Sequence, residues 1–184
     1  MNHYAAPELA NAFRTVRRNT VQAAEEIPEG KYDFVAAPGG RSVRGLLTHI
    51  AFLTMIPEDM HKTNRLTTLS GYDFGAIVGR VDAEERTSRT KAQIIELLRS
   101  EGERFASWLE SLTPDELGER IADFGTAPAR MRLEHLMGVK EHEMHHRGQL
   151  MLVQRMLGMV PHLTRQREER FRARAAAATA SAAT

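Results

Sequence analysis

The sequence contains no cysteine and no long run of apolar residues. Without cysteine, the chain can form neither disulfide bonds nor thiolate metal ligands, and any thiol chemistry would need an external thiol. No stretch reaches the roughly 20 apolar residues of a membrane span, and residues 1–18 lack the apolar segment of a secretion signal. We therefore expect a cytoplasmic protein that does not interact with membranes.

An excess of charge of one sign is also missing. The 25 Lys and Arg residues face 24 Asp and Glu residues, which leaves a formal net charge of +1. A protein without a strong overall field does not attract nucleic acids by its charge alone, so we expect no nucleic-acid partner. The chain has 184 residues and is 42% hydrophobic, which suits one globular domain with a sizeable core.

Two helices are predicted in the first third of the chain. The first covers residues 7–27 and ends before Pro28, and the second is capped by Ser42 and is ended or kinked by Pro57. In both, the inward positions recur at steps of three and four residues: Leu9, Phe13, Val16 and Thr20, then Leu46, His49, Leu53 and Ile56.

Residues 66–88 are rich in Thr, Gly and Asp and show no sustained period, which predicts a long crossover that lets neighbouring helices run parallel. A third helix is expected to start near Ser88 or Thr90. Its core positions are Ile94, Leu97, Leu98, Phe105, Trp108 and Leu112. After it, Thr113 and Glu116 form a capping box around Pro114, which predicts a short extra helix.

The fourth long helix is predicted over residues 131–157, and Gly158 ends it. Residues 161–184 favour helix but have no apolar face, so we expect a solvated helical extension, rich in Arg and Ala, that frays into a disordered tail. No repeat and no convincing strand pattern is present. The sequence therefore predicts an all-α four-helix bundle over residues 1–160, with a long crossover between helices 2 and 3, followed by the extension.

Histidines are concentrated in the fourth helix, in the segment EHEMHHRGQL at residues 141–150. His142 and His146 are four residues apart, so both imidazoles lie over one face, which we expect to be the inward one. At that spacing their nitrogens can converge on one ion at ~2.0–2.1 Å, and His49 holds a similar inward position on the second helix. Three imidazoles leave a fourth position open, as in catalytic sites; the alternative is a structural polar cluster.

The other histidines fit the site less well. His145 lies about 80° from the centre of the stripe, so we expect it beside the ligands or at the rim, as a candidate catalytic residue. His135 is two turns from His142, too far to share an ion, and either lines a pocket mouth or is buried. His3, His61 and His162 fall near termini or loops and are expected to be solvated.

Residues 142–146 also match the zincin pattern H-E-x-x-H, in which Glu143 would be the general base of a metalloprotease. The extended metzincin pattern fails, because Gly148 comes one residue early and Leu152 stands where a third histidine is required. Glu143 also falls about 100° from His142 on the helical wheel, which favours a position behind the ligands or at the surface. We therefore treat the protease as the lesser hypothesis.

A wider resemblance comes from RSVRGLLTHIAF at residues 41–52 together with EHEMHHRGQLMLVQRMLG at residues 141–158. These segments resemble the DinB-like (DinB/YfiT-like) family of four-helix-bundle metalloproteins, and the resemblance covers roughly residues 7–160. It implies a frequently dimeric bundle with one divalent metal ion, often zinc or nickel, bound by the histidines at positions 49, 142 and 146. Some members resemble S-transferases or isomerases that activate a small thiol such as mycothiol or bacillithiol.

Three functional hypotheses follow. The first is a metal-dependent S-transferase, whose partners would be a small-molecule thiol and an electrophile. The second is a metal-dependent hydrolase, with His145 or Glu143 relaying a proton. The third is a non-catalytic stress-response scaffold that holds a metal. We also expect a homodimer, because Met137, Met144 and Met151 form a second stripe that either packs internally or contributes to a dimer face.

Overall fold

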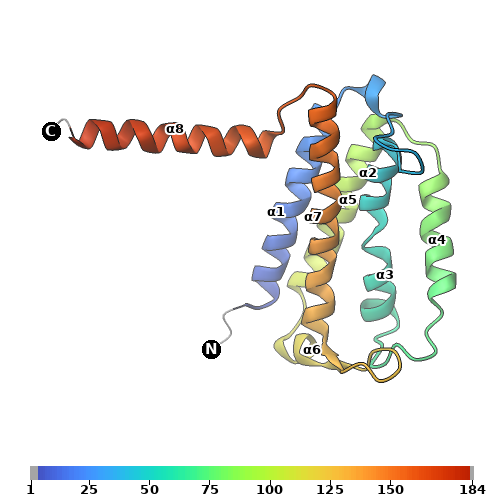
Figure 1. The fold of residues 1–184 in the computed structure, drawn as a ribbon. Coiled ribbons are helices and arrows are strands. Elements are labelled where there is room, and N and C mark those ends of the chain that lie inside the picture. The colour runs from blue at the N-terminus through green and yellow to red at the C-terminus, as the bar shows by residue number, and fades with distance from the viewer. Residues whose placement is uncertain (1–3, 183–184) are drawn as a thin grey trace.

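The computed structural model describes residues 4–182, which form an all-α bundle (Figure 1). The bundle is built from α1 (Ala6–Glu26), α2 (Val43–Phe52) with its continuation in α3 (Met55–Glu58) and the π-helix η2 (Asp59–Thr63), α5 (Lys91–Glu110) and α7 (Arg132–Met156). The remaining elements are η1 (Glu29–Lys31), α4 (Phe74–Arg86), α6 (Pro114–Gly118), β1 (Arg120–Ile121), β2 (Arg130–Met131) and α8 (His162–Ala182).

The core forms where the apolar stripes of the long helices meet. The four inward positions predicted for the first helix are all buried on α1. On α5, Ile94, Leu98 and Phe105 are fully buried, and the Phe105 ring meets Phe13 edge to face at 4.9 Å. Edge-to-face aromatic pairs stabilise a core beyond the area that they bury. The predicted bundle is therefore confirmed, and the periodicity of three and four residues is its cause.

The second helix is interrupted, as Pro57 predicted, but the break lies upstream of the proline. Pro57 sits in the first turn of α3, and the helix opens at Leu53 and Thr54. Proline has no N–H to donate to the carbonyl four residues earlier, and its ring clashes with that carbonyl, which here belongs to Leu53. The chain then passes into η2, whose wider turn places Met60 and His61 in buried positions.

The prediction of an irregular crossover at residues 66–88 was wrong in one respect, because it contains α4. The Asp73 side chain caps this helix by accepting a hydrogen bond from the Ala76 N–H at 3.0 Å. Ile77 and Val81, four residues apart, are its buried positions, and two glycines weaken the rest of the pattern. Since α4 carries the chain back along the bundle, α2 and α5 run in the same direction, as the crossover predicted (Figure 1).

The connection between α5 and α7 combines a confirmed prediction with a missed one. Thr113 and Glu116 form the expected capping box of α6, with the Glu116 carboxylate accepting from the Thr113 N–H at 2.8 Å. Strands were not expected, but β1 and β2 pair as an antiparallel ladder of two residues each. A ladder this short has no alternating pattern that a sequence could reveal.

The C-terminal extension is a helix, α8, which projects sideways from the end of the bundle (Figure 1). From Arg167 to Ser181 its side chains are exposed, including Phe171 at 61%. The ion pair of Arg165 with Glu26 holds its first turn against α1 at 2.5 Å. The domain boundary at residue 160 stays a prediction. Among the described residues, no helix has the length and apolar character that a membrane crossing requires.

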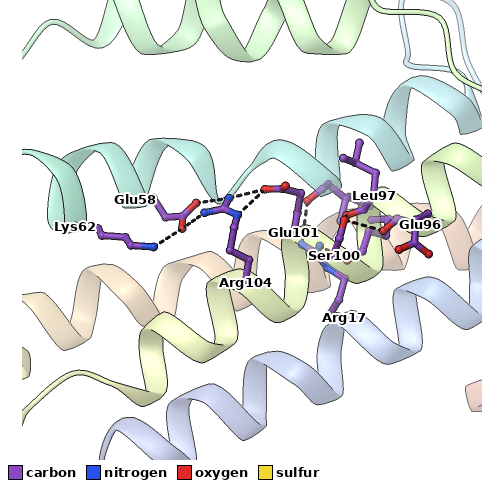
Figure 2. Close-up of polar contacts among 10 residues, drawn as sticks. Arg17, Glu58, Lys62, Glu96, Leu97, Ser100, Glu101 and Arg104 are labelled. Atoms are coloured by element: carbon purple, nitrogen blue, oxygen red, sulfur yellow. Dashed lines mark hydrogen bonds and ion pairs between the residues drawn. The ribbon is translucent and has the colours of Figure 1, made fainter.

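Ion pairs hold α3 and η2, which continue the second helix, against α5. Figure 2 shows Arg104 reaching from α5 to the Glu58 carboxylate on α3, where one nitrogen–oxygen distance is 2.7 Å. Lys62 on η2 approaches the same carboxylate at 3.6 Å, and Arg104 also contacts Glu101 on its own helix. A carboxylate shared by two cations on different elements holds the elements in register. These contacts keep α3 and η2 against α5.

Arg17 joins all four long segments at the centre of the bundle. From α1, its Nε contacts both oxygens of Glu143 on α7 at 3.0 and 3.1 Å. Its Nη1 donates to the Leu98 carbonyl on α5 at 2.8 Å, and its Nη2 donates to the Ile50 carbonyl on α2 at 3.1 Å. Figure 2 shows the side chain pointing from α1 toward α5. Gly102 makes room for it, because a Cβ there would lie 2.6 Å from Arg17 Cγ.

Candidate metal centre

Three histidines from two helices converge at one point. His49 on α2 and His142 and His146 on α7 each offer a ring nitrogen, and these atoms all lie within 4.8 Å of one another. The His49 ring lies 4.7 Å from the His146 ring and 5.5 Å from the His142 ring, measured between centroids. These are the three residues that the sequence spacing and the family resemblance both selected, and the structure brings them together.

Glu85 on α4 sets the orientation of the first histidine. Its Oε1 lies 2.6 Å from Nδ1 of His49, while its Oε2 lies 3.3 Å from Nε of Arg41. Because a carboxylate accepts, Nδ1 of His49 carries the proton and Nε2 carries the lone pair that a metal needs. The sequence did not reveal Glu85 because residues 66–88 showed no sustained helical period; the capping Asp73 was the available signal.

Gln149 has the same role for His146. Its Oε1 lies 2.9 Å from Nδ1 of His146, which assigns the lone pair to Nε2. That Nε2 lies 2.8 Å from Nε2 of His142, so the two nitrogens face each other across the point of convergence. The amide Nε2 of Gln149 also lies 3.2 Å from Nε2 of His145. Gln149 therefore links the ligand set to the more exposed His145.

The two histidines of α7 differ in burial, which corrects the expectation that both face inward. His146 is 7% exposed, whereas His142 lies on the exposed edge of the helix. The buried stripe runs through Val139, Glu143, His146 and Leu150, so its centre is rotated away from His142. Burial lowers the pKa of both imidazoles, and for His142 the neighbouring histidines lower it further. Neutral imidazole is the form that binds metals.

The remaining histidines divide into an exposed and a buried group. His145 is exposed, with its ring 5.0 Å from that of His146, and it lies outside the converging set; its catalytic role stays a prediction. His61 and His162 were expected to be solvated but are 4% and 1% exposed, because η2 and the first turn of α8 pack against the bundle. His135 is partly buried, and His3 lies outside the described residues.

Glu143 does not face the histidines. Its side chain is 0% exposed, and both oxygens are engaged by Arg17. A carboxylate held this way in the core cannot reach a substrate at the metal site, so the structure argues against the general base of a zincin. The expectation of a surface position was also wrong, because α1 packs on the side of α7 that carries Glu143.

A cavity of about 240 Å³ adjoins the ligands, between the second helix and α7. His49 and His142 line it at one end, and His61 and His135 line it at the other. The walls between them are largely apolar and come from the second helix, η2, α4 and α7. The site can therefore accept a small molecule beside the three nitrogens.

Replacing Glu85 with glutamine is expected to weaken metal affinity by roughly 10–100-fold, because such partners orient the ligand and raise its basicity. A competition titration with a chromophoric chelator would measure the change. Glu84→Gln is the matched control, since this neighbouring carboxylate pairs with Arg89 instead. Equal affinities of the Glu85 variant and the wild type would show that Glu85 does not support the site.

The stability of the protein is expected to depend on pH through His61. Burial, and then the charge of Arg132, lowers the pKa of His61 from 6.5 to about 3. The folded state thus binds fewer protons than the unfolded state. The free energy of unfolding therefore carries no penalty from His61 above pH 6.5, and it falls as the pH drops from 6.5 toward about 3. Urea titrations should show that, between these pH values, the free energy of unfolding of the wild type falls more steeply than that of His61→Asn, by up to about 1.4 kcal/mol per pH unit. Equal slopes would contradict this.

Comparisons with known proteins agree with the fold. Residues 12–150 match the family model of the DinB superfamily. YfiT from Bacillus subtilis, described as a probable metal-dependent hydrolase with an unusual four-helix bundle topology, is 18% identical with a TM-score of 0.63, over 84% of this chain and 88% of its own.

Two further solved structures are similar. The DinB-like protein YjoA from Bacillus subtilis is 22% identical with a TM-score of 0.61, over 83% of this chain and 93% of its own. A DinB-like protein from Bacillus cereus is 16% identical with a TM-score of 0.63, over 84% and 93%. No curated protein gives a significant match. Because the family model covers more than half of the sequence, the chain belongs to the DinB superfamily.

Proposed function

We propose that this protein is a divalent-metal-dependent enzyme whose ion is bound by His49, His142 and His146. One observation carries the proposal: the three ligand nitrogens lie within 4.8 Å of one another. The Nδ1 atoms of two of these rings are held by the side-chain oxygens of Glu85 and Gln149, which places the lone pair of each ring on Nε2, the atom that would bind the ion. A purely structural cluster would not need both rings aligned in this way.

The donor set fits a catalytic rather than a structural ion. Three neutral imidazoles leave a coordination position for water or substrate, and they accept zinc or nickel, the two metals that we propose. When bound, such an ion supplies a Lewis acid that lowers the pKa of water or of a thiol. The similar structure of YfiT, described as a probable metal-dependent hydrolase, supports the same class of chemistry.

The side chains around the ligands have separable roles. Glu85 and Gln149 keep the ring orientations, and the largely apolar walls of the adjoining cavity can hold the nonpolar part of a substrate. His145 is exposed and connected to His146 through Gln149, so we propose that it exchanges protons between the site and solvent. Its ring also packs edge to face against that of His146, with 5.0 Å between the ring centroids.

Hydrolysis is the first candidate reaction, and transfer of an external thiol to an electrophile is the second. The absence of cysteine in the chain and the resemblance to thiol-dependent family members support the second. In both, the nucleophile comes from solution. The proposed partners are therefore small molecules, and either a hydrolysable ester or amide or a thiol together with its electrophile would serve.

Turnover by the metal-loaded protein tests this proposal. It would be assayed on p-nitrophenyl esters without thiol, and on 1-chloro-2,4-dinitrobenzene with bacillithiol or mycothiol. We expect activity only in the metal-loaded form, and none in His142→Ala, because that variant lacks one ligand. Ester cleavage without thiol would identify a hydrolase, and strict thiol dependence a transferase. Retention of metal without turnover in either assay would favour the scaffold hypothesis.

A homodimer also remains part of the proposal. Of the three methionines expected on a dimer face, Met137 packs against the core and Met151 is partly buried, while Met144 is 44% exposed. Leu152 and Met156, four residues apart on α7, are also exposed, at 57% and 52%. These exposed apolar side chains support α7 as the contact surface.

A further inference from the structure

The cavity beside the ligands is elongated along α7. His142 lines one end and His135 the other, and a separation of seven positions along the helix corresponds to about 10.5 Å. Between the two ends, the wall is formed by apolar side chains: Leu53, Ile56, Pro57, Met60, Val81 and Val139. A ligand in this cavity would therefore have a polar group at each end and an apolar middle.

The far end presents a hydrogen-bond donor, and the tautomer of His61 shows why. Nη1 of Arg132 lies 3.2 Å from Nδ1 of His61, and a guanidinium can only donate. Nδ1 of His61 must therefore accept, which places the ring proton on Nε2. His61 thus offers an Nε2–H to whatever occupies this end of the cavity. The π-turn of η2 brings it there, and such turns are frequent at functional sites.

The far end is also uncharged. Burial lowers the pKa of both His61 and His135, so both rings are neutral near pH 7. The charge of Arg132 is offset by its ion pair with Glu119. Within the described part of the chain, Nε2 of His135 is buried and has no hydrogen-bond partner, a costly state that a bound polar group would relieve.

We infer that this cavity is the substrate pocket, and that the substrate is a small, uncharged, elongated molecule with a hydrogen-bond acceptor at the end remote from the metal. A carbonyl or amide oxygen bound by His61 fits the donor, and an apolar segment fits the walls. A volume of about 240 Å³ lies below the roughly 300–1,000 Å³ of pockets for drug-sized ligands, so the molecule is smaller. This inference rests on the proposed metal-dependent function.

Gly138 offers a way to close the pocket without disturbing the fold. It lines the cavity on the same side of α7 as His135 and His142, and a Cβ at this position meets nothing within 4 Å. Gly138→Leu should therefore fill the pocket, and replacing glycine inside a helix also favours folding. Gly79→Leu is the matched control, because Gly79 is an exposed glycine of α4 with the same free space and lies outside the pocket.

Two probes are used. Acetohydroxamate contacts only the metal and does not extend into the cavity. The long probe is an alkyl hydroxamate that reaches His135 and ends in a primary amide. Zinc-loaded wild type and Gly79→Leu should bind both probes. Gly138→Leu should retain its zinc and acetohydroxamate binding but lose at least about tenfold in affinity for the long probe, since several CH₂ groups are no longer buried. Calorimetric titration and zinc content would be measured in parallel.

The end group of the long probe tests the donor without altering the protein. In wild type, the terminal amide should bind roughly two- to tenfold more tightly than a terminal methyl group, and a terminal ammonium should bind more weakly than either. Equal binding of the long probe by Gly138→Leu and wild type, or a preference for ammonium, would overturn the pocket while leaving the metal site intact. Failure of wild type to bind zinc would overturn the proposed function and the pocket together.

Discussion

Replacing Glu143 with alanine is expected to lower the free energy of unfolding by about 3–5 kcal/mol. Arg17 and Glu143 are 4% and 0% exposed, so the substitution leaves a guanidinium in the core without its carboxylate. Charges buried without a partner are strongly destabilising, whereas a charged pair buried together can be nearly neutral. Urea denaturation monitored by circular dichroism would measure the loss.

The control for this prediction is Glu141→Ala. Glu141 lies two residues earlier on α7 with its side chain 62% exposed, so its loss should change stability by less than about 0.5 kcal/mol. A double-mutant cycle with Arg17→Met should show that the double variant loses less than the sum of the two single variants. If the losses in free energy of unfolding were additive, or if Glu143→Ala were as stable as the wild type, the pair would not couple α1 to α7.

Wild-type protein purified without a tag and without added metal is expected to hold about one equivalent of a divalent ion, and His49→Ala, His142→Ala and His146→Ala are each expected to lose it. With three protein ligands, removing one leaves two imidazoles, so affinity should fall by more than the roughly 10–100-fold expected for an orienting partner such as Glu85. Elemental mass spectrometry would give the metal content and identity.

His145→Ala is the matched control for the ligand variants. It removes a neighbouring histidine on the same helix that lies outside the converging set, so the metal content should stay at the wild-type level. If the wild type held no metal even after incubation with zinc or nickel, the three histidines would be a structural polar cluster. Such a result would leave a helical interaction protein as the better hypothesis.

The architecture and the ligands could be predicted because their signals are local. Apolar side chains at steps of three and four residues mark a helix and its buried face wherever the helix packs, and α1, α5 and α7 follow this rule. The capping box of α6 is likewise contained within four residues. The spacing of His142 and His146 is a property of one helix, so it selected two candidate ligands before any packing was known.

The features that were missed depend on how the helices are arranged. Glu85 acts at the site only because α4 packs beside α2, and the weak pattern of α4 concealed both the helix and the residue. His61 and His162 lie next to a turn and a terminus in sequence, yet neighbouring elements bury them. Sequence distance from a helix end does not determine burial, because burial is decided by the partner surface.

The sequence by itself determined the long helices of the bundle, the pair of histidines four residues apart on α7, and the absence of a protein thiol, since each depends on local spacing or composition. Only the tertiary structure decided that Glu143 pairs with Arg17 in the core rather than serving as a base, and that His61 faces a cavity as a neutral donor. Charge and tautomer follow from the groups that surround a side chain in space, and those groups come from distant parts of the chain.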